Sequence, residues 1–120
     1  MITLTPEPLT AEAFAPFGDV IEPRQRDSFL INDGQCRRFH RLATAQTGAD
    51  GQAVISLFRP CPVALPTTLT LVERHPLGSQ AFMPLAGQPW LVVVAPPGEP
   101  PLPEHLRAFL VDGATGVNYF

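Results

Sequence analysis

The chain has 120 residues, 45% of them apolar and 16% charged, a composition typical of one folded domain (residues 1–120) rather than of a disordered chain. A formal charge of −3 argues against nucleic acid or an anionic membrane as a partner. All eight basic residues are arginine, which excludes Schiff-base, pyridoxal and P-loop chemistry that depends on lysine.

The first ten residues, MITLTPEPLT, contain neither the basic nor the apolar stretch of a secretory signal. No apolar run approaches the ~20 residues that a membrane-spanning helix needs. Two cysteines, Cys36 and Cys61, do not form a CxxC pair, and we expect them to be reduced, buried thiols. These features predict a cytoplasmic protein without membrane association.

One short helix is predicted close to the N-terminus. Thr10 can cap its first turn, Phe14 and Phe17 would share one face, and Gly18 can end it. Pro16 limits its length.

Beyond this helix, fifteen prolines and nine glycines divide the chain into short segments, which is typical of an all-β domain. The segments predicted as strands are 29–32, 36–43, 53–60, 67–75, 80–85, 89–96 and 106–113. Turns are predicted between them at 32–34, 47–51, 76–78, 86–89, 96–103 and 112–116. We expect no second domain.

Alternation of side chains places polar groups on the same faces as apolar ones in three of these strands. The shared faces hold Glu73 and His75 with Leu69 and Leu71, Arg59 with Ile55 and Leu57, and Arg38 and His40 with Leu42. In a β-barrel this pattern gathers several polar groups in one cavity, but exposed strand ends would produce it too.

The spacing of Glu73, His75, Gln80 and Gly87 resembles the first cupin motif, in which two histidines, a Glu or Gln and a Gly occur at the same intervals. In cupins these side chains converge inside a jelly-roll barrel and commonly bind a metal. Here a glutamate and an amide occupy two of the ligand positions. Glu, His and Gln form a weak ligand set, so we expect no metal site.

A closer resemblance covers nearly the whole chain. The segments that carry it are FGDVI (17–21), INDGQCRRFHRLA (31–43), ERHPLGSQAFMPL (73–85), LRAF (106–109) and GVNY (116–119). Together they resemble the ureidoglycolate lyase family. The resemblance implies an all-β, cupin-like jelly-roll β-barrel with one short N-terminal helix, and cleavage of ureidoglycolate to glyoxylate and urea in allantoin and purine catabolism, usually by a homodimer. The family continues beyond GVNY, so we expect the barrel to be incomplete at its C-terminal end.

The substrate's chemistry assigns expected roles to these residues. Ureidoglycolate cleavage needs a base for the hydroxyl, an acid for the departing nitrogen and a group that holds the carboxylate. We expect Glu73 and His75 to be the acid–base pair and Gln80 to orient the substrate. Arg38 or Arg59 would bind its carboxylate, since an arginine fork suits that group. His40 and Asn118 are further candidate substrate contacts, and no cofactor is expected.

Simpler interpretations stay open at this point. Glu73 and His75 could be a charged strand end entering the turn at 76–78, and Arg38, His40 and Arg59 could be exposed strand residues. Asn118 lies near the end of the chain, where fraying is expected. The shortened chain could be a silent binding module or a gene remnant, and a metal-dependent cupin of different chemistry is a third possibility.

Overall fold

The structure, a computed structural model, describes residues 2–120 and is dominated by short strands, which confirms the all-β class. Its elements in chain order are β1 (Glu7–Pro8), α1 (Ala11–Phe14), β2 (Gly18–Ile21), η1 (Gln25–Asp27), β3 (Ser28–Ile31), β4 (Cys36–Phe39), β5 (Gln80–Phe82), β6 (Trp90–Val94), η2 (Pro103–His105), β7 (Arg107–Val111) and β8 (Gly116–Tyr119). Among residues 2–120, no helix is long and apolar enough to cross a membrane.

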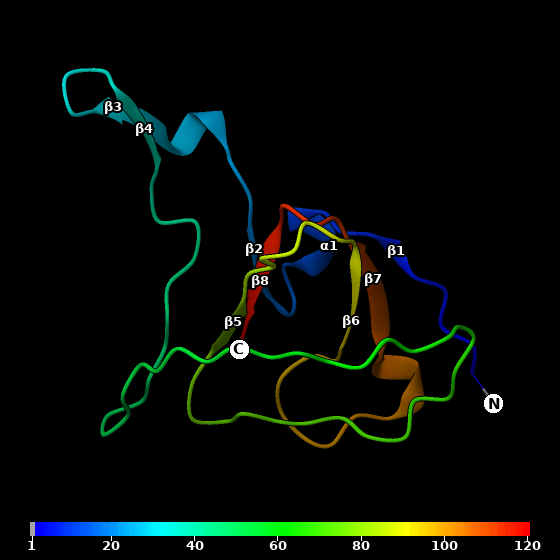
Figure 1. Cartoon of the computed structure of the whole chain (residues 1–120). Coiled ribbons are helices and arrows are strands. Elements are labelled where there is room, and N and C mark those ends of the chain that lie inside the picture. The colour runs from blue at the N-terminus through cyan, green and yellow to red at the C-terminus, as the bar shows by residue number, and fades with distance from the viewer. Residues whose placement is uncertain (1) are drawn as a thin grey trace.

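The strands form two three-stranded sheets and a separate hairpin (Figure 1). One sheet has the order β1-β7-β6, with β1 parallel to β7 and β6 antiparallel to it. The other has the order β2-β8-β5, and β8 is antiparallel to both neighbours, with Val117 opposite Val20 on one side and Phe82 on the other. This arrangement is consistent with a cupin-like β fold.

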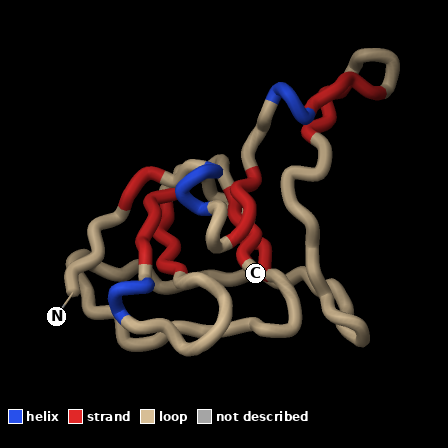
Figure 2. Tube along the Cα trace, turned by 180° about the vertical axis from the view of Figure 1, so that it is seen from behind, coloured by secondary structure: helices blue, strands red, loops and turns tan. Residues whose placement is uncertain are grey.

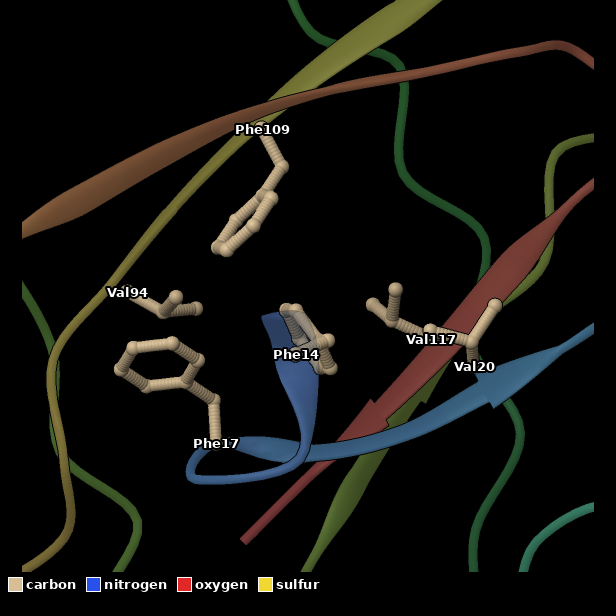
Figure 3. Close-up of a cluster of buried hydrophobic side chains, with 6 residues drawn as sticks. All are labelled: Phe14, Phe17, Val20, Val94, Phe109 and Val117. Carbon is tan, nitrogen blue, oxygen red and sulfur yellow. The ribbon is translucent and has the colours of Figure 1, made fainter. Parts of the chain in front are cut away.

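The core lies between the two sheets and is closed by the short helix (Figure 3). Its buried members are Phe14, Phe17, Val20, Val94, Phe109 and Val117. The rings of Phe14 and Phe109 meet edge to face, with centroids 5.4 Å apart. Burial of each such ring contributes roughly 1.5–3 kcal/mol. The predicted cap is confirmed, because the Thr10 hydroxyl oxygen accepts a hydrogen bond from the Ala13 N–H at 3.1 Å.

The β3–β4 hairpin projects away from both sheets (Figures 1 and 2). Its turn contains Asn32 and Asp33 at φ values of 53° and 55°, a region that these residue types tolerate better than most, so the predicted turn is confirmed. At the base of the hairpin, the segments that enter and leave it are joined by a hydrogen bond of 3.2 Å from the guanidinium of Arg24 to the carbonyl oxygen of Leu42. The strand predicted over 36–43 is shorter than expected, because it ends at Phe39.

Two of the predicted strands, 53–60 and 67–75, are wrong. Residues 40–79 contain no helix or strand and form the long loop that is tan in Figure 2. Three prolines at 60, 62 and 66 lack the N–H that a sheet ladder needs, and no strand pairs with either segment. The result is an exposed apolar surface, in which the side chain of Ile55 is 99% accessible. Cys36 and Cys61 are also exposed, which contradicts the expected burial.

The strand predicted over 29–32 forms one residue earlier as β3, and the strands predicted over 80–85, 89–96 and 106–113 form with shorter bounds as β5, β6 and β7. Strands β1, β2 and β8 were not predicted. Strand β8 is the centre of its sheet, so the expected fraying of the chain end is wrong for residues 116–119. Its close contact with β2 requires Gly18, since a Cβ there would lie 2.0 Å from the carbonyl oxygen of Asn118.

Candidate active site

Two strand ends supply the ordered half of the candidate site. Gln80, the first residue of β5, is directly opposite Tyr119, the last residue of β8. Directly opposed residues project from the same face of a sheet, and the Tyr119 hydroxyl donates a hydrogen bond to Oε1 of Gln80 at 2.5 Å. The ring of Phe82 stacks on that of Tyr119 at 5.7 Å, which fixes the phenol against the core.

The loop before β5 supplies the other half. Oε2 of Glu73 lies 3.4 Å from Nε2 of His75, as expected for residues two positions apart in extended backbone. The His75 ring centroid is 6.4 Å from that of Tyr119. The structure therefore brings Glu73, His75 and Gln80 together around one phenol.

The surroundings of Tyr119 raise the pKa of its phenol. Burial raises the pKa of this phenol above 10.0, and the nearby Glu73 carboxylate raises the pKa further, because both disfavour a phenolate. Tyr119 is thus a protonated hydrogen-bond donor at neutral pH. It was absent from the residues expected at the site, and only its position in the GVNY segment pointed to it.

The loop pair is open to solvent. The side chains of His75 and Glu73 are 42% and 72% accessible, which limits the energy of their contact. A hollow of about 330 Å³ lies elsewhere, between α1, β2 and the base of the hairpin. Its lining includes Asp19, Arg24 and Arg41 but not Glu73, His75, Gln80 or Tyr119.

Asn118 lies on the other face of the same sheet, since its neighbour Tyr119 faces Gln80. Its side chain is only 1% exposed. The amide donates to the Asp19 carboxylate at 3.3 Å and to the carbonyl of Thr44 at 3.1 Å. The structure does not bring it to Glu73 and His75, and its contacts join the long loop to β2 and β8.

The structure does not bring Arg38 or His40 to this cluster either. Arg38 is exposed on the projecting hairpin (Figure 1). His40 follows the hairpin, and its ring packs at 5.7 Å from that of Phe29. Nδ1 of His40 is buried and has no hydrogen-bond partner among residues 2–120.

Arg59 is exposed on the long loop, but its neighbour Phe58 reaches the candidate site. The Phe58 ring centroid is 5.9 Å from that of Phe82, which in turn stacks on Tyr119. Of the two arginines expected to bind the carboxylate, Arg59 is the one that directly follows a residue in contact with the aromatic rings of the site.

The cupin motif implies a metal, and the residues around Tyr119 do not fit one. Oε1 of Gln80, its best ligand atom, accepts from Tyr119, and Nε2 of His75 faces the carboxylate of Glu73. Within residues 2–120, no three His, Cys, Asp or Glu side chains form a cluster that could hold an ion. The arrangement is instead suited to proton transfer and hydrogen bonding.

Comparison with known proteins gives a consistent result. The model of the family described as ureidoglycolate lyase matches residues 1–120. A protein named ureidoglycolate lyase from Stutzerimonas stutzeri (strain A1501) is 58% identical over 120 residues, covering 99% of this chain and 71% of that relative. Proteins of the same name from Pseudomonas fluorescens (strain Pf0-1) and Pseudomonas paraeruginosa (strain DSM 24068 / PA7) are 55% and 56% identical, each over 99% of this chain and over 72% and 71% of their own lengths.

Proposed function

The chain belongs to the ureidoglycolate lyase family, and we propose that Glu73 and His75 are the acid–base pair with which it cleaves ureidoglycolate to glyoxylate and urea. The activity is that of a carbon–nitrogen lyase. The identity to relatives of that name supports an enzyme, and nothing in the comparisons favours a silent binding module.

The reaction needs one proton to move from oxygen to nitrogen. The Glu73 carboxylate takes the proton of the substrate hydroxyl, and the electron pair of that O–H bond forms the aldehyde C=O of glyoxylate. The C–N bond breaks, and protonated His75 gives its proton to the departing urea nitrogen. A proton then passes from Glu73 to His75 across their 3.4 Å contact and restores the starting state, so atoms and charges balance.

The substrate carboxylate needs a cation. We assign this role to Arg59, supported by the contact of the adjacent Phe58 with the aromatic side chains of the site. Gln80 holds the ureido group through its amide. Asn118 is not retained as a substrate contact, because its side chain is 1% exposed and its amide is bonded to Asp19 and Thr44 on the other face of the sheet.

A homodimer is proposed for a separate reason. The accessible surface is 9417 Å², whereas a compact monomer of 13.0 kDa exposes about 6,300 Å². The radius of gyration is 16.0 Å, against about 13.6 Å for a compact chain of this length. The excess of about 3,000 Å² per chain exceeds the roughly 1,000–2,500 Å² that each partner buries in an obligate interface, so one chain exposes enough surface for such an interface. Light scattering should give twice 13.0 kDa; a monomer at micromolar concentration would contradict the dimer.

In such a dimer, the projecting hairpin would carry Arg38 and His40 to the substrate of the second copy, which is how we retain them as substrate contacts. A mixture of an Arg38→Ala chain with a Glu73→Gln chain should then regain urea release that neither has alone. Additive residual activity in the mixture would remove Arg38 from the site.

We also propose a cytoplasmic location, supported by two exposed cysteines that form no disulfide. Fractionation of cells that express the chain should recover it with cytoplasmic markers. Recovery with periplasmic markers would contradict this location.

The catalytic assignment is tested by single substitutions. Glu73→Gln and His75→Ala should each lower urea and glyoxylate release roughly 10²- to 10⁴-fold, the usual contribution of a positioned acid or base. The matched controls are Glu104→Gln and His105→Ala, which make the same changes at exposed positions of η2. Unchanged turnover in both test variants would remove the pair from the mechanism.

A further inference from the structure

The tyrosine at the end of β8 has contacts that neither the acid–base pair nor a packing role accounts for. Its ring is stacked on Phe82 with an interplanar angle of 23°, and the imidazole of His75 lies beyond it at 6.4 Å. Its hydroxyl reaches across the sheet to Gln80. Tyr119 thus contacts Gln80 and Phe82 on the strands and lies beside His75, which the loop carries.

The direction of the hydrogen bond determines what Gln80 can do. A side-chain amide has an acceptor oxygen and a donor NH₂ group. Because the phenol stays protonated next to Glu73, it acts as donor and occupies Oε1. The NH₂ group of Gln80 is then left to face the substrate, and it can bind only an acceptor.

We propose that Tyr119 is a positioning residue that fixes the Gln80 amide, so that Gln80 donates to the carbonyl oxygen of the substrate's ureido group, and that its ring holds His75 beside the sheet. This inference rests on the proposed function for its substrate. The specificity that follows is for a leaving group with an acceptor carbonyl next to the departing nitrogen.

The first test is a double-mutant cycle on urea release with Tyr119→Phe and Gln80→Ala. Tyr119→Phe keeps the ring and its stacking and removes only the hydroxyl. A single hydrogen bond is worth about 0.5–1.5 kcal/mol, so kcat/KM should fall roughly threefold to tenfold in Tyr119→Phe. In the Gln80→Ala background the same change should have almost no further effect, since the hydroxyl acts through Gln80. Independent, additive losses would overturn the proposal.

The second test does not need activity. Tyr119 is the only tyrosine in the chain, so the alkaline absorbance change of tyrosinate reports this residue alone. Glu73→Gln should lower the pKa of Tyr119, because it removes a neighbouring negative charge, and Glu104→Gln on η2 should leave it unchanged. An identical titration in wild type and Glu73→Gln would overturn the placement of the loop against Tyr119.

Failure of the proposed function and failure of the inference about Tyr119 give different results in these two tests. If the wild-type chain releases no urea, the proposed function fails, and the titration still decides whether Tyr119 joins the loop to the sheet. If the wild-type chain is active and the cycle is additive, the inference about Tyr119 fails alone.

Discussion

Two regions of similar apolar pattern behave differently in this molecule. Segments 80–113 contain three predicted strands, and all three form and pair. Residues 53–75 contain two predicted strands with alternating apolar and polar side chains, and both are loop. The difference is the partner. Strand β8 pairs along both of its edges, with β2 and β5, whereas no strand pairs with residues 53–75. Alternation therefore describes a strand's faces, but pairing decides whether the strand exists.

The candidate site lies on the boundary between these regions. Gln80 and Tyr119 belong to the paired strands, and Glu73 and His75 belong to the loop. The geometry of the site depends on how the loop is held against the sheet, which variants on either side can test.

The largest contrast is expected between a core ring and a loop side chain. Phe109→Ala should lower the free energy of unfolding by about 3–5 kcal/mol, because it leaves a cavity next to Phe14 and Phe17. Leu57→Ala on the exposed loop should change it by less than about 0.5 kcal/mol under monomeric conditions. Urea denaturation measures both, and similar losses would erase the distinction between the two regions.

A smaller effect is expected where the loop is tied to the sheet. Asn118→Ala should cost about 1–3 kcal/mol, since it leaves the Asp19 carboxylate and the Thr44 carbonyl without their shared donor. Gln52→Ala, an exposed amide on the same loop, is the control. Thermal unfolding gives the comparison. Equal stability of the two variants would show that Asn118 does not hold the loop.

A still smaller effect tests the short helix that closes the core. Thr10→Ala should cost about 1 kcal/mol, because the Ala13 N–H loses its capping oxygen. Thr68→Ala, which alters an exposed loop threonine, is the matched control. If denaturant midpoints of the two variants coincide, the cap contributes nothing.

The last effect is confined to alkaline pH. Because the pKa of Tyr119 is raised in the folded chain, the unfolded chain loses this proton first as pH rises above 10.0. The contribution of Tyr119 to stability is therefore complete below that value and declines as pH rises towards the folded pKa. Tyr119→Phe should flatten this decline. An equally steep decline in the variant would assign it to other groups.

Local features of the fold could be predicted, and long-range ones could not. The Thr10 cap and the Asn32–Asp33 turn depend on neighbouring residues, so their chemistry is visible in the sequence. The pairing of Gln80 with Tyr119 joins residues 39 positions apart. No local pattern in or around the GVNY segment predicts this long-range contact. The Glu73–His75–Gln80 spacing indicated a site, but the residue at its centre came from a strand that was not predicted.

The most direct test is whether the loop histidine touches the sheet tyrosine in solution. A nuclear Overhauser cross-peak between the His75 imidazole and the ring of Tyr119, the only tyrosine, would be observed if the rings lie as described. The account predicts that cross-peak, and its loss in His75→Ala. A well-resolved Tyr119 ring with cross-peaks to Phe82 and none to His75 would contradict it.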